Sequence, residues 1–267
     1  MQRSLDLHPQ VVCSGEGHLH EFVARPLAEM IKAYNVKLAA VAEAVYEGEP
    51  YCLPVSRDEQ IAITRMVMIA MMERRIKPGA RMIGDKTPAN AQIVDDLAVL
   101  FPGMKFIAML RDPRDVAASR LGHARRAGHA EADDHSSDFY RALVAASARD
   151  WRICVERSFA LAGRAPDQAL VVRYEDLVLD PAGRLARVFD FLGVETSAAQ
   201  LAAIVQASSF ESLSGGRKPG VEARGSFYRK GVSGDWPNHL DGEALEILVR
   251  ECGAAVGLAG YRIEPAR

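Results

Sequence analysis

The 267-residue sequence lacks the features that mark membrane-spanning, secreted and nucleic-acid-binding proteins. No apolar run approaches the length of a membrane span, and the first residues, MQRSLDLHPQ, lack the apolar core of a signal peptide. The formal net charge is −2, whereas general binding to nucleic acid or to a membrane surface favours a broad basic face. We therefore expect a cytoplasmic protein with neither a nucleic-acid partner nor a membrane partner.

Cysteine is also scarce, with four residues that lie far apart and form no Cys-x-x-Cys pair. This spacing predicts reduced thiols rather than a disulfide scaffold or a zinc site. His18 and His20 form a His-x-His pattern in a glycine-containing loop, but no clear third ligand accompanies them. We therefore expect no metal site.

The most informative stretch is residues 105–120, KFIAMLRDPRDVAASR. Its short apolar run suits a buried strand of a parallel sheet, and Asp112 can cap a helix whose first residue is Pro113. Arg111 would then lie at the carboxyl edge of the sheet, where open α/β sheets bind ligands and a helix N-terminus favours anions. Ser119 follows about two helical turns later, so both side chains could hold one phosphate. The alternative is a solvated Arg111–Asp112 pair beside an ordinary turn.

Two further apolar segments, residues 81–84 and 169–174, are strand candidates, and each leads into a helical pattern. After the first, Thr87 can cap a helix that begins at a proline, which places Lys86 at a second strand-to-helix junction. Strands that alternate with helices predict an α/β fold with a central parallel sheet flanked by helices. Since no internal repeat or clear linker is visible, we expect a single domain over residues 1–267.

Two segments outside these units also carry information. Residues 122–137 are polar and contain several histidines, which predicts a mobile loop, either near a substrate or simply solvated. Late in the chain, Arg229 and Lys230 precede Gly231 and Gly234. Adjacent cations before glycines make a segment whose backbone can approach a phosphate closely.

Three motifs taken together resemble the sulfotransferases that use 3′-phosphoadenosine 5′-phosphosulfate (PAPS). These are Arg111-Asp112-Pro113 with Ser119, the strand VVRYEDL, and the late segment RKGVSGDW. The segments GDKTP and HPQVVCSGE are similar to the tyrosylprotein and bacterial branch of that family. The resemblance covers nearly the whole chain. It implies a three-layer sulfotransferase fold like that of the P-loop NTPases, and transfer of sulfonate from PAPS to an acceptor hydroxyl or amine without a metal.

The resemblance also implies roles for individual residues in binding the nucleotide. Arg111 and Ser119 would hold its 3′-phosphate, and the late segment would close over the same phosphate. Phe210 would stack on the adenine, and Tyr174 matches a position near the nucleotide. The residues implied in cofactor binding are therefore Arg111, Ser119, Tyr174, Phe210, Arg229, Lys230 and Gly231.

The catalytic residues that the resemblance implies lie earlier in the chain. Lys86 matches a lysine that contacts the transferring sulfonate, and Glu16 matches the catalytic base, with His18 as the second candidate. The chemistry needs these residue types, because the transferring group carries diffuse negative charge and the acceptor hydroxyl must lose a proton.

One departure from the family pattern affects what we expect. The family's first strand and its phosphate loop of Pro-Arg/Lys-Ser-Gly-Thr-Thr type have no counterpart in residues 1–267, because the chain starts inside the helix that leads to His8-Pro9. We therefore expect weak activity, and the alternative is a truncated or degenerate relative that binds 3′,5′-adenosine bisphosphate (PAP) without catalysis. Residues 34–56 and 122–138 would shape the acceptor pocket, but nothing in them distinguishes a small molecule, a saccharide or a peptide, or indicates an oligomeric state.

Overall fold

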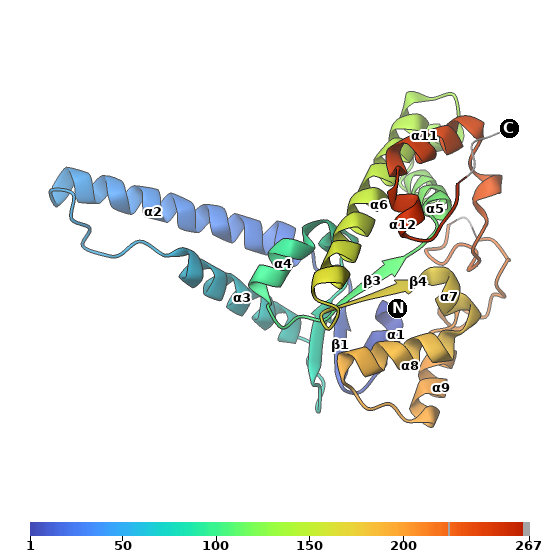
Figure 1. Cartoon of the computed structure of the whole chain (residues 1–267), viewed down its shortest axis with the longest axis horizontal. Coiled ribbons are helices and arrows are strands. Elements are labelled where there is room, and N and C mark those ends of the chain that lie inside the picture. Colours follow the sequence, from blue (N-terminus) through green and yellow to red (C-terminus); the bar gives the residue numbers. More distant parts are fainter. Residues whose placement is uncertain (224, 264–267) are drawn as a thin grey trace. The chain divides into compact units, whose positions relative to one another are not determined.

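The computed structural model of the chain describes residues 1–223 and 225–263 (Figure 1). The chain divides into two compact units, Gln2–Met104 and Lys105–Arg267 with Met1, and each is described by itself. The single domain over residues 1–267 stays a prediction. No helix in the described ranges is both long and apolar enough to cross a membrane.

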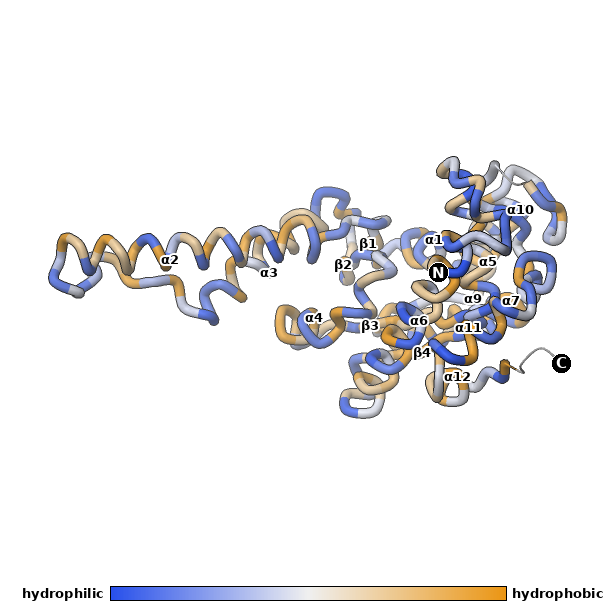
Figure 2. The backbone as a smooth tube through the Cα atoms, turned by 90° about the horizontal axis from the view of Figure 1, so that it is seen from above, coloured by the Kyte–Doolittle hydropathy of each residue, from blue (hydrophilic) through white to orange (hydrophobic). Residues whose placement is uncertain are grey.

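The unit Gln2–Met104 is built around a pair of short parallel strands. The two strands are hydrogen-bonded neighbours, although helices separate them in the sequence. Its elements are α1 (Gln2–Asp6), β1 (Val11–Ser14), a π-helical turn (His20–Ala24), α2 (Arg25–Val45), α3 (Arg57–Glu73), β2 (Met82–Asp85), a 3₁₀ turn (Pro88–Ile93) and α4 (Val94–Leu100). β1 and β2 pair from Val11 opposite Met82 to Ser14 opposite Asp85. In Figures 1 and 2, α2 runs away from the strands and α3 returns alongside it, and apolar positions recur along both helices.

The unit Lys105–Arg267 contains the second parallel pair and most of the helices. Its elements are β3 (Phe106–Leu110), α5 (Pro113–Arg126), a 3₁₀ turn (Ala130–Asp133), α6 (Asp138–Arg164), β4 (Ala169–Arg173), α7 (Tyr174–Leu179), α8 (Pro181–Leu192), α9 (Ala198–Ala207), α10 (Phe210–Leu213), a 3₁₀ turn (Trp236–Asn238), α11 (Gly242–Cys252) and α12 (Ala255–Leu258). β3 and β4 pair from Phe106 opposite Ala169 to Leu110 opposite Arg173. The crossover between them is α5 and α6.

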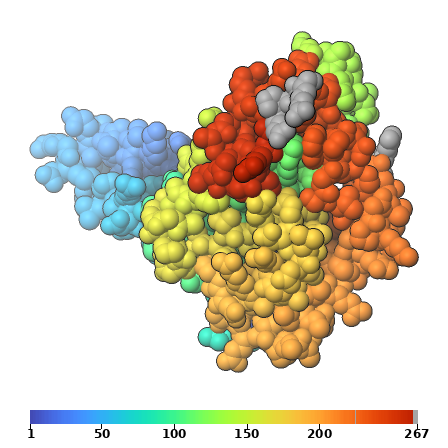
Figure 3. All heavy atoms as spheres, turned by 45° about the vertical axis from the view of Figure 1, so that its right-hand side comes forward, coloured from blue at the N-terminus to red at the C-terminus, as the bar shows by residue number. Residues whose placement is uncertain are grey.

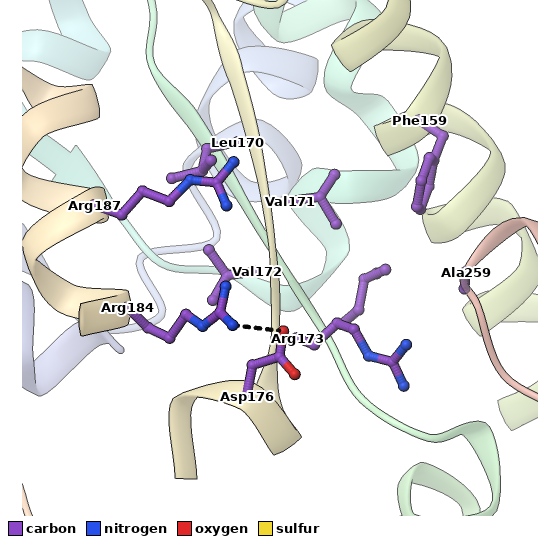
Figure 4. Close-up of a pocket in the computed structure, with 10 residues that line it drawn as sticks. Phe159, Leu170, Val171, Val172, Arg173, Asp176, Arg184, Arg187 and Ala259 are labelled. Atoms are coloured by element: carbon purple, nitrogen blue, oxygen red, sulfur yellow. Dashed lines mark ion pairs between the residues drawn. The ribbon is translucent and has the colours of Figure 1, made fainter. Parts of the chain in front are cut away.

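The two faces of β4 are covered by different helices, as the alternation of side chains along a strand requires. Figure 4 shows Arg184 and Arg187 of α8 on the side of Leu170 and Val172, and Phe159 of α6 on the side of Val171. The main core of this unit lies between α5, α6 and α11. Its fully buried side chains include Leu121, Tyr140, Val144, Val155 and Leu248.

These elements confirm the α/β class with parallel strands and helical crossovers. In the described ranges the strands form two parallel pairs, one in each unit, rather than one continuous hydrogen-bonded sheet. Val11–Ser14, which the sequence presents only as a short apolar step, is a strand. The predicted strand 169–174 ends at Arg173, because Tyr174 begins α7.

The prediction of a mobile loop over residues 122–137 is wrong, because this stretch contains the end of α5 and a 3₁₀ turn. α5 continues to Arg126, because Leu121 and Gly122 are buried on its inner face. Ala132 is fully buried in the 3₁₀ turn that follows, where Arg125 forms an ion pair with Asp133 at 2.6 Å. A buried alanine in an otherwise polar segment gives too little apolar signal to predict this order.

The helix caps were predictable in one case and not in another. Asp112 accepts a hydrogen bond from the backbone N–H of Arg114 and so caps α5, as predicted. Thr87 stands at the predicted N-cap position, directly before Pro88, but its side chain makes no capping hydrogen bond. Its hydroxyl instead donates to the carboxylate of Asp85 at 2.7 Å.

Candidate functional site

Arg111 lies where β3 ends and α5 begins, and its guanidinium group is held on several sides. The group lies over the ring of Tyr174 at 4.7 Å, and Nη2 donates to the backbone oxygen of Val232 at 3.2 Å. The backbone oxygen of Arg111 accepts a hydrogen bond from Trp151 Nε1 at 2.9 Å. The Nε atom is buried and has no hydrogen-bond partner among the described residues. The guanidinium group of Arg111 is therefore positioned at the N-terminus of α5 by its contacts with Tyr174 and Val232.

Asp115, in the first turn of α5, connects this helix to the late segment 229–236. Its Oδ2 atom accepts hydrogen bonds from Gly234 N at 2.7 Å and Ser233 Oγ at 3.2 Å, and Oδ1 accepts one from Trp236 N at 3.2 Å. Arg111 Nη2 lies 3.6 Å from the same carboxylate, whose side chain is 1% exposed. Sequence reasoning missed this residue, although its i,i+4 spacing from Arg111 was a usable signal.

Arg229 and Lys230 share one carboxylate in this structure. Arg229 Nη2 donates to Asp235 Oδ2 at 2.8 Å, and Lys230 Nζ donates to Asp235 Oδ1 at 2.5 Å. His239 and Asn238 contact the same side chain at 3.0 and 2.9 Å. Burial opposes the charge on Asp235, but the hydrogen bonds from Lys230, Asn238, His239 and Arg229 outweigh it and hold the pKa well below its usual range. Both cations predicted to reach a phosphate are thus already paired.

Gly231 and Phe210 are in direct contact. Gly231 has φ of +67°, a conformation that favours glycine, and a Cβ atom added there would overlap the Phe210 ring. The guanidinium group of Arg217 lies over the same ring at 5.4 Å and donates to the backbone oxygen of Arg229 at 3.1 Å. Phe210 is therefore fixed against the late segment that follows it in sequence.

Ser119 is half-buried on α5. Gly122 lies three residues further along the same face, and a Cβ atom added there would lie 3.8 Å from Arg229 Cδ. Figure 3 shows the orange-to-red part of this unit packed around the green region of α5. Contacts therefore connect six of the predicted cofactor residues near the start of α5, namely Arg111, Tyr174, Phe210, Arg229, Lys230 and Gly231, and Ser119 lies three residues before Gly122 on the same helix.

The three predicted catalytic residues lie together in the other unit. Lys86 Nζ donates to Glu16 Oε1 at 2.5 Å, and His18 Nε2 lies 3.8 Å from Glu16 Oε2. Glu21 Oε2 is 3.6 Å from the other ring nitrogen of His18. The grouping arises because Glu16 and Lys86 follow parallel strands that end at the same edge. Within the part of the chain that is described, no three His, Cys, Asp or Glu side chains gather as a metal site would require.

A pocket of about 180 Å³ lies beside β4. Its lining includes Arg173, Arg184 and Arg187, and an ion pair of 3.7 Å joins Arg184 to Asp176 (Figure 4). None of the predicted site residues lines it. The chemistry of the motifs, rather than this cavity, therefore marks the candidate site.

Comparison with known proteins identifies the family. A model of the sulfotransferase family matches residues 1–198, which include the GDKTP and RDPRD motifs. The chain belongs to the sulfotransferase family. The late segment that contains Arg229 and Lys230 lies beyond the matched residues.

Curated relatives in this family align with only part of the chain. Human sulfotransferase 2B1 is 29% identical over 147 residues, which cover 51% of this chain and 40% of the relative. A flavonol sulfotransferase-like protein of Flaveria bidentis is 35% identical over 95 residues, which cover 31% of each chain. The chain thus matches less than half of the length of these relatives.

Solved structures support the fold over nearly the whole chain. The sulfotransferase domain from the curacin biosynthetic pathway matches with a TM-score of 0.53 and 18% identity, covering 98% of this chain and 93% of that one. Retinol dehydratase, solved with androsterone and the inactive cofactor PAP, matches with a TM-score of 0.50 and 20% identity over 96% of this chain and 83% of that one. At these identities the similarity establishes the sulfotransferase fold.

Proposed function

We propose that this sulfotransferase moves the sulfonate group of PAPS to a hydroxyl or amine of an acceptor. Family membership supports sulfonate transfer, and retinol dehydratase, which has the same fold, binds PAP. The observation that carries the proposal is the set of contacts that joins Arg111, at the end of β3, to the late segment and to α5. Arg111 is thereby bonded to Val232, which directly follows the residues of the late segment proposed to bind phosphate, Arg229, Lys230 and Gly231.

The residues around α5 fit the 3′-phosphate of the nucleotide. The Arg111 side chain is 26% exposed and is positioned by Tyr174 and Val232, and an oriented arginine suits a phosphate oxygen. The N-terminus of α5 adds a favourable electrostatic potential for an anion. Arg229 and Lys230 would contribute by sharing their charge between Asp235 and the phosphate, since both cations are bound to that carboxylate.

The Lys86–Glu16 pair suits the transfer step in the other unit. Glu16 would accept the proton of the acceptor hydroxyl, with His18 as the second candidate for this role. Once Glu16 is protonated, Lys86 loses its negative partner at 2.5 Å, so its charge becomes available to the negatively charged oxygens of the sulfonate. Proton removal and charge stabilisation would therefore be coupled through one ion pair.

The experiment that tests the proposal has two parts. Transfer from radiolabelled PAPS is measured with a panel of phenols, saccharides and a tyrosine peptide, and binding of PAP is measured by calorimetry. Arg111→Ala should weaken PAP binding by roughly 1.5–3 kcal/mol, the scale of a charge-assisted hydrogen bond. The matched control is Arg120→Ala, because Arg120 lies on the same helix but pairs with Asp150 at 2.7 Å. Equal affinities for wild type and Arg111→Ala would refute the assignment of Arg111.

The same experiment separates the proposal from its alternative, a relative that binds PAP without catalysis. PAP binding without transfer to any acceptor in the panel would favour that alternative. We also propose a reducing compartment such as the cytoplasm. The support is that the four cysteines, all within the described ranges, form no disulfide bond.

A further inference from the structure

We propose that Asp85 and Thr87 are positioning residues that hold the loop between β1 and the π-helical turn, and thereby keep Glu16 opposite Lys86. This inference rests on the proposed function, because it assigns the loop its catalytic purpose. The loop contains Gly17 and His18, whose backbone N–H groups donate to Asp85, the last residue of β2, and to Thr87, two residues later.

Asp85 uses both of its carboxylate oxygens in this arrangement. Oδ1 accepts the backbone N–H of Gly17 at 2.9 Å. Oδ2 accepts the hydroxyl of Thr87 at 2.7 Å and the amide of Asn90 at 3.2 Å. Because Asp85 lies directly opposite Ser14 in the parallel register, it faces the start of the loop that it holds.

Thr87 extends the same network to the next residue of the loop. Its hydroxyl donates its one proton to Asp85, so its oxygen is free to accept the backbone N–H of His18, at 3.2 Å. Thr87 is 7% exposed, so an unpaired N–H at His18 would lie in a poorly hydrated place. The hydroxyl thus both donates and accepts here, and it makes no capping hydrogen bond to the 3₁₀ turn that follows.

The backbone held by these contacts is strained. His18 has φ of +47°, in the left-handed region that residues other than glycine rarely adopt. At Gly17, a Cβ atom would lie 2.8 Å from Asp85 Oδ1 and 3.2 Å from Leu19 Cγ, so the loop also needs glycine there. Such a strained conformation persists only where neighbouring groups hold it. Here the hydrogen bonds from Gly17 N to Asp85 and from His18 N to Thr87 hold the loop.

The strained turn has a consequence for the catalytic groups. It places the side chains of Glu16 and His18 on the same side of the loop. There Glu16 Oε1 lies 2.5 Å from Lys86 Nζ, and Glu16 Oε2 lies 3.8 Å from His18 Nε2. A base must stand within hydrogen-bond reach of the proton that it removes, and misplacement by about 1 Å can cost roughly 10²-fold in rate. Release of the loop should therefore reduce turnover.

The test compares Thr87→Val, which removes the hydroxyl at nearly constant shape, with Thr87→Ser, which keeps it, and with Asp85→Asn. The matched control is Thr64→Val, because Thr64 is a buried threonine of α3 in the same unit. Hydrogen exchange of the Gly17 and His18 amides is followed by NMR, and kcat and KM for PAPS are measured with the acceptor panel.

In Thr87→Val we expect the His18 amide to exchange about tenfold faster or more, and Thr87→Ser to restore the wild-type rate. In Asp85→Asn we expect both amides to exchange faster. Gly17 loses a charged acceptor, and an asparagine that keeps its oxygen toward Gly17 presents NH₂ to Thr87, which cannot accept the Thr87 proton and so weakens the bond to His18. Turnover should fall by roughly 10–100-fold in Thr87→Val and Asp85→Asn, with KM for PAPS changed by less than about twofold. Thr64→Val should alter neither the two amides nor turnover.

Unchanged exchange at His18 in Thr87→Val would overturn the proposed network. Faster exchange with unchanged kcat would overturn the positioning role. A wild-type chain that transfers no sulfonate would contradict the proposed function instead, and the exchange rates would still decide whether Asp85 and Thr87 hold the loop.

Discussion

Replacement of Asp115 by asparagine tests how the late segment is fastened to α5. The Asp115 side chain is 1% exposed, and both of its oxygens accept hydrogen bonds from that segment. An asparagine side chain keeps one oxygen and places N–H donors where the other was. It therefore loses either the bond from Gly234 N or the bond from Trp236 N. The negative charge 3.6 Å from Arg111 Nη2 is lost as well.

The size of the effect follows from the bonds lost. A hydrogen bond to a charged acceptor contributes about 1.5–3 kcal/mol, and solvent cannot replace it at a side chain so deeply buried. We expect Asp115→Asn to lower the free energy of unfolding by about that amount. PAP affinity should fall by about tenfold or more, because the late segment and Arg111 are no longer held together, and tenfold corresponds to about 1.4 kcal/mol.

Urea unfolding and calorimetric titration with PAP measure the two effects. Asp150→Asn is the control, because Asp150 also pairs with an arginine of α5 but its side chain is 40% exposed. Exposed ion pairs contribute at most about 1 kcal/mol, so this variant should stay near wild type. Equal losses of stability and affinity in Asp115→Asn and Asp150→Asn would refute the reasoning.

Two further predictions concern ionisable groups. The pKa of Asp235 is lowered on folding, so this residue stabilises the fold above its unfolded pKa of about 3.9 and that stability is lost as the pH falls below it. Unfolding by urea between about pH 5 and pH 2 should therefore be less pH-dependent in Asp235→Asn than in wild type; the same slope in both would contradict this prediction. Burial raises the pKa of Cys13 to about 11 and that of Cys252 to about 12, whereas Cys52 is exposed. Iodoacetamide at about pH 8 should alkylate Cys52 first. If mass spectrometry finds Cys252 alkylated as fast as Cys52, Cys252 is not buried as described.

The parts of this fold that the sequence predicted are those with local causes. The apolar run before Asp112 predicts a strand, Asp112 predicts a helix cap, and Pro113 predicts the first helical residue. The structure has all three features. The grouping of Glu16 with Lys86 was also accessible, because parallel strands bring their carboxyl ends to one edge. Val11–Ser14 escaped prediction because four residues are too few to show a period.

The parts that the sequence could not predict depend on partners distant in the chain. Thr87 has the local pattern of a helix cap, but it bonds instead to Asp85 and to the backbone of His18, 69 residues away. Asp115 is followed by ordinary helix residues, and its partners lie more than 115 positions later. Secondary-structure and capping propensities depend on a residue and its sequence neighbours. They do not indicate which backbone N–H groups, distant in the sequence, need a hydrogen-bond acceptor.

The sulfotransferase motifs thus owe their geometry to aspartates that are not themselves expected to touch substrate. Asp85 in GDKTP and Asp115 in RDPRD each accept backbone N–H groups of a separate loop, and Asp235 in GDW binds the two cations of its own segment. Loops that must approach a phosphate or a sulfonate need glycine and exposed backbone, so packing of their own side chains contributes little to holding them. A carboxylate that follows a strand or lies on a helix can fix such a loop through hydrogen bonds alone. This requirement explains why carboxylates stand beside the cations in each motif of a protein that we propose to bind an anion.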